Sequence, residues 1–268
     1  MKFAIKGKDN SEIGKVEVPG QFEEGIRKDL IKRAYLAACS RKRASYGAAP
    51  EAGMQHVAKL SRRRRKYRGS YGYGISRVPR KILSRNGTRF NWRAAEMPGT
   101  VGGRRAHPPK ADKVWAQKIN RKERRKAIRS ALAAVVDVET VQGKGHRVPD
   151  GYPFALADEF ESYAKTKEVV NALLTLGFDK ELERTRGRRI KSGRGTRRGR
   201  KYKRSVGPLL VVSEECALMK AGRNIPGIDV ATVDKLHIDQ LAPGSHPGRA
   251  TLFSKKALER LKEEKLYM

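Results

Sequence analysis

The hydrophobic pattern near the N-terminus predicts one strand followed by one helix. Ile13, Val16 and Val18 suggest a strand, which Pro19-Gly20 then interrupts. Apolar positions then recur every three or four residues, which predicts an amphipathic helix over residues 25–43. The apolar face of this helix consists of Ile26, Leu30, Ile31, Ala34, Tyr35 and Ala38.

Helical periodicity returns after residue 112 and predicts a helix over residues 121–136. Asn120 is a suitable N-cap, and Glu123 follows three positions later, as in a capping box. The apolar face comes from the later turns, whereas the first turns carry Arg121, Lys122, Arg124, Arg125 and Lys126. Cations at a helix N-terminus oppose the helix macrodipole, so stability does not account for them. Contact with a phosphate surface would account for these cations.

The rest of the chain alternates between helical and extended patterns. The predicted elements are a helix from Thr166 as N-cap to Gly177, a strand at 208–213, a short helix at 216–221 closed by Gly222, strands at 229–232 and 251–253, and a last helix with Ser254 as N-cap. Such alternation predicts the α/β class: a layered globular domain with a largely parallel sheet flanked by helices.

Between residues 45 and 112 the apolar periodicity disappears. The segment is rich in Gly, Pro, Arg, Ser and Tyr, and it cannot bury enough apolar surface to offset its ordering entropy. A disordered linker is one interpretation. We favour a binding extension, because linkers rarely contain aromatic residues interleaved with arginines. The aromatic residues here are Tyr67, Tyr71, Tyr73, Phe90 and Trp92.

These patterns predict a globular α/β domain with a basic insertion. The domain comprises residues 1–44 and 113–268, and residues 45–112 form a long, extended, non-globular RNA-binding loop inserted in it. A second basic tract covers residues 184–206, where glycines let the backbone approach phosphates and arginines can bind phosphate oxygens or stack on bases. Its candidate RNA-binding residues are Arg188, Arg189, Arg194, Arg197, Arg198, Arg200, Lys201 and Lys203.

The overall charge calls for a polyanionic partner. The chain has 61 Lys and Arg against 28 Asp and Glu, a formal net charge of +33. Without phosphates to neutralise it, this charge would oppose compaction. A merely solvated basic surface is less favoured, because the cations are clustered. The longest strongly apolar run, residues 209–212, is far below the ~20 residues that span a bilayer, and no signal-peptide pattern is present, so we expect a cytoplasmic protein without a membrane partner.

No catalytic or metal-binding constellation is apparent in the sequence. Cys39 and Cys216 stand alone, so we expect two buried, reduced thiols and no metal site. The glycine-rich strings lack the Gly-Lys-Ser/Thr of a phosphate-binding loop, so no cofactor and no small-molecule substrate is expected. His237 and Asp239 could be a base and its orienting carboxylate, but an ordinary pair is the simpler interpretation. The chain is predicted not to be an enzyme.

Four strings carry a resemblance to a known family. They are GMQHVAKLSRRRRKYRGSYGYGISRVPRK, NGTRFNWRAAEMPGTVGGRRAHPPK, KINRKERRKAIRSALAA, and RGTRRGRKYKR before GPLLVV. Together they resemble the archaeal and eukaryotic branch of the universal large-subunit ribosomal protein L-four family, strongly over residues 53–212 and more loosely at the ends. The long C-terminal extension of eukaryotic members does not follow Met268, so an archaeal-type member is expected.

The resemblance implies a structural constituent of the large ribosomal subunit. Its globular domain would lie on the outer surface, and its loop would line the nascent-peptide exit tunnel. The implied partners are large-subunit ribosomal RNA and neighbouring ribosomal proteins, including one whose hairpin shares the tunnel constriction. The RNA contacts implied in the loop are Arg62, Arg63, Arg64, Arg65, Lys66, Arg68, Arg77, Arg80, Lys81, Arg89, Trp92, Arg93, Arg104 and Arg105; Arg121, Arg124 and Arg125 join them from the helix start.

Two other functions use the same composition. An RNA-modifying or RNA-processing enzyme with basic arms would need a polar constellation on the α/β core, which the sequence does not show. A chromatin or architectural DNA-binding protein would be expected to have Lys-rich helices or tails. Loops of Arg, Gly and aromatic residues instead suit single-stranded and irregular RNA.

Overall fold

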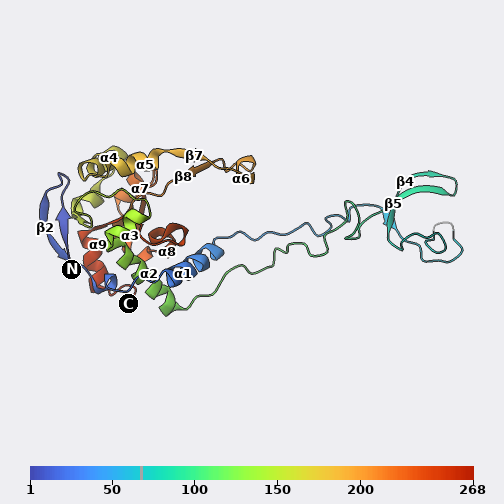
Figure 1. Cartoon of the computed structure of the whole chain (residues 1–268), viewed down its shortest axis with the longest axis horizontal. Coiled ribbons are helices and arrows are strands. Elements are labelled where there is room, and N and C mark those ends of the chain that lie inside the picture. The colour runs from blue at the N-terminus through green and yellow to red at the C-terminus, as the bar shows by residue number, and fades with distance from the viewer. Residues whose placement is uncertain (67–68) are drawn as a thin grey trace. The chain divides into compact units, whose positions relative to one another are not determined.

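The chain divides into two compact units (Figure 1). The computed structural model describes residues 1–66 and 69–268. One unit, the body, comprises residues 1–42 and 116–268, and the other, the inserted unit, comprises residues 43–115. The boundaries expected from the sequence, 45 and 112, fall inside the inserted unit.

The body is built on a six-stranded sheet with the strand order β10-β9-β11-β6-β1-β2. Every neighbouring pair is parallel except the β1–β2 hairpin, which is antiparallel. The prediction of an α/β fold with a largely parallel sheet is confirmed. The strands are β1 (Lys2–Lys6), β2 (Glu12–Glu17), β6 (Ala155–Leu156), β9 (Leu209–Val212), β10 (Asp229–Thr232) and β11 (Thr251–Ser254).

The central strands are apolar because both faces of the sheet are covered. All residues of β9 and β11 are buried, as expected for parallel strands between layers of helices. The edge strand β2 is mostly exposed, and of its residues only Val16 is half-buried. The sheet thus changes from fully covered strands to a solvent-facing edge.

Helices pack on the sheet and on one another. Helix α9 contacts β9 and β11, α7 contacts β10 and α4, and α1 packs along α2. The helices of the body are α1 (Lys28–Arg41), α2 (Arg121–Val136), α3 (Val138–Gly143), α4 (Thr166–Thr175), α5 (Asp179–Arg186), α6 (Arg194–Arg197), α7 (Ala217–Gly222), α8 (Ile238–Leu241) and α9 (Lys255–Glu263). Within the described residues, no helix has the length and apolar character needed to cross a membrane.

Three predicted N-caps behave differently. Ser254 caps α9 as predicted, because its hydroxyl accepts a hydrogen bond from the Ala257 amide at 3.2 Å. Asn120 occupies the N-cap position of α2, but its side chain forms no capping hydrogen bond. The prediction for Thr166 is wrong by one residue: Lys165 has the extended backbone of an N-cap, and Thr166 is already helical.

Both predicted thiols are less buried than expected. Cys39 and Cys216 are free and half-buried, because Cys39 lies near the C-terminal end of α1 and Cys216 occupies the N-cap position of α7. Neither side chain is enclosed in the core.

The two chain segments that lead into the inserted unit meet at the end of α1. The Gln117 amide donates a hydrogen bond of 2.9 Å to the Ser40 hydroxyl, which itself donates to the Ala37 carbonyl. The body is therefore closed at the point of insertion by its own hydrogen bonds.

The inserted unit contains regular structure that the sequence analysis did not predict. Strands β3 (Ala58–Lys59), β4 (Arg80–Asn86) and β5 (Arg89–Ala94) form an antiparallel sheet, and Gly87, with φ of +55°, lies in the turn between β4 and β5. Exposure alternates along β5, with Phe90, Trp92 and Ala94 on the less exposed face. This alternation of Phe90, Trp92 and Ala94 with polar residues is present in the sequence but covers only six residues.

Candidate nucleic-acid interface

Several cations of the body are paired with carboxylates. Arg129 binds Glu24 at 3.0 Å, and this hydrogen bond holds the pKa of Glu24 below its ordinary value. Other pairs of the body are Arg33–Glu123, Lys42–Asp239, Lys165–Glu168, Lys235–Glu215, Arg249–Asp229, Lys255–Glu259, Arg260–Glu264 and Lys262–Glu17. The positive charge of the body is thus partly neutralised within the protein.

In the described part of the inserted unit, the cations have no such partners. Its sequence holds only three acidic residues, Glu51, Glu96 and Asp112, against a large excess of Lys and Arg. Among its described residues, no cation lies within 4.0 Å of a carboxylate oxygen. This unit therefore presents uncompensated positive charge.

Aromatic rings lie against several of these cations. The Arg43 guanidinium lies 3.7 Å from the centroid of Trp115, and Arg77 lies 4.5 Å from that of Tyr71. Trp115 also stacks on Tyr46 at a centroid distance of 5.7 Å. Aromatic rings next to guanidinium groups form a surface on which bases can stack, as in proteins that bind irregular or single-stranded RNA.

Arg80 is an exception among the predicted contacts. Its side chain is buried, and its guanidinium donates hydrogen bonds to the carbonyls of Ser76 and Val78 at 2.5 and 3.3 Å. The same guanidinium lies 5.4 Å from the Trp92 ring centroid. Arg80 thus organises the interior of the inserted unit, because its donors are directed to the protein itself.

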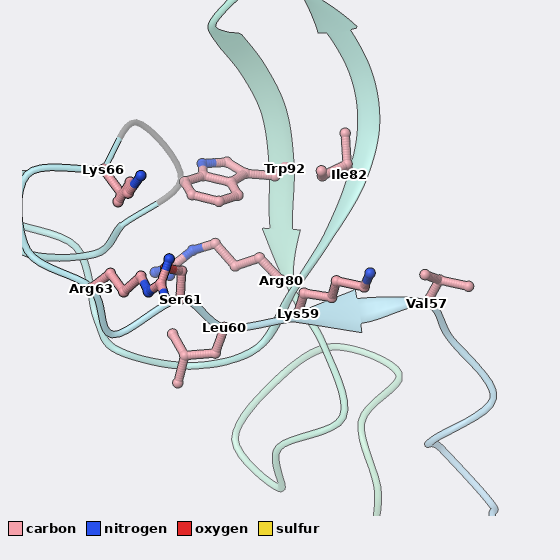
Figure 2. Close-up of a pocket in the computed structure, with 9 residues that line it drawn as sticks. All are labelled: Val57, Lys59, Leu60, Ser61, Arg63, Lys66, Arg80, Ile82 and Trp92. Carbon is pink, nitrogen blue, oxygen red and sulfur yellow. The ribbon is translucent and has the colours of Figure 1, made fainter.

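A cavity of about 520 Å³ lies between strands β3, β4 and β5 and the chain segment that follows β3 (Figure 2). Figure 2 shows Trp92, Arg80, Arg63 and Lys66 on one side and Lys59, Val57 and Ile82 on the other. Its remaining lining residues are Leu60 and Ser61. The cavity brings together four of the predicted RNA-binding residues: Arg63, Lys66, Arg80 and Trp92.

The second basic tract forms a small hairpin. Strands β7 (Arg188–Ile190) and β8 (Tyr202–Arg204) pair antiparallel, with α6 between them, and every residue of both strands is exposed. Figure 1 shows β7, β8 and α6 leaving the body next to α5. Arg188 and Lys201 lie 5.3 and 5.7 Å from the Tyr202 ring centroid. Apart from Tyr202 and Ile190, the strands present only cations to solvent.

A buried ionic cluster holds the base of this hairpin. Glu181, fully buried on α5, binds Arg184 and the Nδ1 atom of His146, the latter at 2.7 Å. Arg184 also donates to the Val206 carbonyl at 2.6 Å, which ties α5 to the end of the tract. Burial alone would raise the pKa of Glu181, but hydrogen bonds from Arg184 and His146 outweigh it and hold the pKa at about 2. Glu181 therefore stays ionised at neutral pH.

The start of α2 carries both paired and unpaired cations. Arg125 donates to the Met268 carbonyl at 2.7 Å, and Lys126 lies 3.6 Å from Glu24. Arg121 and Arg124 are exposed and form no ion pair within the described structure. These two remain available to an outside anion.

The predicted RNA-binding residues differ in exposure. Trp92, Lys81 and Arg125 are half-buried, Arg80 is buried, and Arg68 lies outside the described residues. The exposed ones are Arg62, Arg63, Arg64, Arg65, Lys66, Arg77, Arg89, Arg93, Arg104, Arg105, Arg121, Arg124, Arg188, Arg189, Arg194, Arg197, Arg198, Arg200, Lys201 and Lys203. Sequence reasoning omitted Lys59 of the pocket and Arg85, which lies 5.7 Å from the Phe90 ring.

The one pair with a possible catalytic arrangement has other partners. His237 occupies the N-cap position of α8 in a capping box with Gln240, and Asp239 pairs with Lys42. Across residues 1–66 and 69–268, no three His, Cys, Asp or Glu side chains gather as metal ligands. His237 and Asp239 thus serve helix capping and an ion pair.

Comparison with known proteins places the chain among ribosomal proteins. Residues 16–264 match the model of the ribosomal protein L4/L1 family. The large ribosomal subunit protein uL4 of Nanoarchaeum equitans is 51% identical over 268 residues, covering 100% of both chains. The chain belongs to the ribosomal protein L4/L1 family.

Other relatives of the same name agree. The uL4 of Archaeoglobus fulgidus is 40% identical over 97% of this chain and 96% of its own, and that of Methanopyrus kandleri is 40% identical over 98% of both. The predicted resemblance to this family and to its archaeal members is confirmed. Membership also confirms the prediction of a structural ribosomal protein that is not an enzyme.

Proposed function

We propose that the chain is a constituent of the large ribosomal subunit that binds large-subunit ribosomal RNA through two basic segments. These segments are the inserted unit and the tract at residues 184–206. The inserted unit would line the nascent-peptide exit tunnel, beside the hairpin of a neighbouring ribosomal protein. The chain would act in the cytoplasm, where the large subunit works.

The scarcity of carboxylates in the basic segments carries this proposal. Between Arg186 and Val206 the sequence contains no acidic residue, and the hairpin cations are exposed. Cations crowded together repel one another, so a neighbouring polyanion would stabilise these segments. RNA phosphates supply that charge, and the neighbouring aromatic rings suit unpaired bases.

Salt dependence of RNA binding tests the proposal. Arg197, Arg198, Arg200 and Lys201 are replaced together by Gln, and binding of the full chain to a large-subunit ribosomal RNA fragment is measured at several salt concentrations. Each phosphate that is no longer neutralised should lower the log-log slope by about 0.7 to 0.9, so the slope should fall by roughly 3.

A matched variant keeps the change of net charge the same. Lys165, Lys235, Lys255 and Lys262 pair with carboxylates on the body, and their replacement by Gln should leave the slope nearly unchanged. Equal slopes for the two variants would mean that the tract does not meet phosphate, and that net charge alone drives binding.

A further inference from the structure

The cavity of the inserted unit combines a flat aromatic wall with a cationic rim. The Trp92 indole forms the wall, Lys59, Arg63 and Lys66 lie around the cavity, and none of its described lining residues carries a carboxylate. Leu60 and Ile82 complete an apolar lining. Its volume, about 520 Å³, is in the range of small-molecule sites.

Trp92 is held in place by buried contacts. Arg80 lies against its ring at 5.4 Å, and Arg80 is itself fixed by the carbonyls of Ser76 and Val78. Phe90 stacks on Trp92 at a centroid distance of 5.5 Å. The indole also lines a second cavity, of about 220 Å³, with Tyr73. A fixed ring that borders open space is suited to stacking, because little side-chain entropy is lost on binding.

We propose that this cavity binds a single unpaired nucleobase of RNA, stacked on the Trp92 indole, with the adjoining phosphates on Lys59, Arg63 and Lys66. The assignment rests on the proposed RNA-binding function and adds a nucleotide site to it. A paired base cannot enter, because its edge and faces are occupied in the duplex, so the ligand is a bulged or looped-out nucleotide.

Charge favours a nucleotide over an apolar peptide segment. A neutral side chain could fill the apolar part of the cavity, but it would leave the three cations of the rim without a counter-charge. A nucleotide satisfies both parts, because its base has an apolar face and its phosphates carry negative charge.

The test uses the full chain with W115F, so that Trp92 is the only tryptophan. Phe at 115 retains an aromatic ring against Tyr46. The probes are three RNA hairpins of equal length: one with a single bulged adenosine, one with an abasic bulge, and one fully paired. The bulged adenosine should quench Trp92 fluorescence and raise affinity roughly 5- to 150-fold over the other two, the range given by base–aromatic stacking.

Variants separate the pocket from general RNA binding. W92L should abolish the preference for the bulged adenosine while the paired hairpin keeps its affinity and salt slope. W92F should retain part of the preference, which shows that the aromatic face matters and that the unit is still folded.

Three results would overturn the proposal. Equal binding of all three hairpins without quenching would remove the nucleotide pocket but leave the RNA-binding function intact. Quenching by a neutral apolar hexapeptide, without quenching by the bulged RNA, would assign the cavity to a peptide. Failure of every hairpin and of ribosomal RNA fragments to bind would overturn the proposed function together with the pocket.

Discussion

The body outside residues 184–206 and the two basic segments use Lys and Arg in two different ways. On α2, Arg129 lies 3.0 Å from Glu24, and on α9, Lys262 lies 2.8 Å from Glu17. In the β7–β8 hairpin, Arg189 and Lys203 face each other across the strands with no acidic residue nearby in sequence. A cation next to a carboxylate is neutralised within the protein. A cation next to another cation is not, and it can be neutralised by an anion of a binding partner.

The energies involved support this distinction. An exposed ion pair contributes about 0 to 1 kcal/mol, so the pairs of the body refine a stability that comes mainly from its core. Like charges directly opposite each other on neighbouring strands are destabilising. The hairpin therefore has a local electrostatic cost, which binding to a polyanion would offset.

Removing the inserted unit should cause the largest change in RNA binding. Residues 43–115 are replaced by a short Gly-Ser connection, which the Ser40–Gln117 hydrogen bond makes geometrically feasible. The body should stay folded, because loop closure changes by about 0.6 kcal/mol per doubling of length, while the salt slope of RNA binding falls by roughly 4 or more.

Urea unfolding and salt titration of this variant measure the two quantities. A structure of large subunits that contain it should show the exit-tunnel wall incomplete on one side. Cooperative loss of the body would mean that residues 43–115 belong to its core, and an intact tunnel wall would remove the tunnel assignment.

Replacing Glu181 by Gln should have a smaller effect than removing the inserted unit, and it should change only the free energy of unfolding. The carboxylate has a folded pKa of about 2, below its ordinary value of 4.5, so its contribution is complete above about pH 4.5 and is lost as the pH falls toward 2. E181Q should lower the free energy of unfolding by about 3 kcal/mol at pH 7, because it leaves the cationic Arg184 with no charge partner.

Urea unfolding at pH 7 and pH 3 measures this change. The difference between wild type and variant should be smaller at pH 3. A constant difference would show that altered packing or a missing hydrogen bond, and not the charge of Glu181, causes the destabilisation.

The start of α2 offers the smallest but sharpest test. R121Q/R124Q removes two unpaired cations from a helix N-terminus, where they oppose the macrodipole, so the body should gain about 0.5 kcal/mol while the salt slope falls by about 1 to 2. K126Q/R129Q on the same helix removes two cations paired with Glu24. The K126Q/R129Q control should have a lower free energy of unfolding and an unchanged salt slope of RNA binding. A lower salt slope for K126Q/R129Q and an unchanged slope for R121Q/R124Q would mean that the paired cations contact phosphate.

Much of the body was predictable because its apolar pattern is strong. Helix α2 and strand β10 have the predicted bounds, and Leu209–Val212 is buried throughout. Strand β6 has only two residues, which is too short for a pattern. Helix α5 was missed because the residue that anchors it in the core is a charged one, Glu181, and hydropathy reads such a residue as exposed.

The candidate site was predictable in composition but not in arrangement. The arginines of strand β4 look alike in sequence, yet Arg80 is buried against the carbonyls of Ser76 and Val78, whereas Arg85 is exposed. Only the folded backbone determines where those carbonyls lie. The grouping of Lys59 with Trp92 likewise depends on the pairing of β3 with β4, which no local pattern predicts.

The position of β11 sets a time order on the synthesis of the body. This strand joins β9 to β6, and among the described strands of its sheet it is the last in sequence. Until residues 251–254 have been translated, the pair β9–β10 and the group β6–β1–β2 are two separate half-sheets, each with an open apolar edge. Both basic segments are made earlier, at residues 43–115 and 184–206. A newly made chain therefore carries both basic segments before it has a complete domain, and it is vulnerable to aggregation with nucleic acid during that interval.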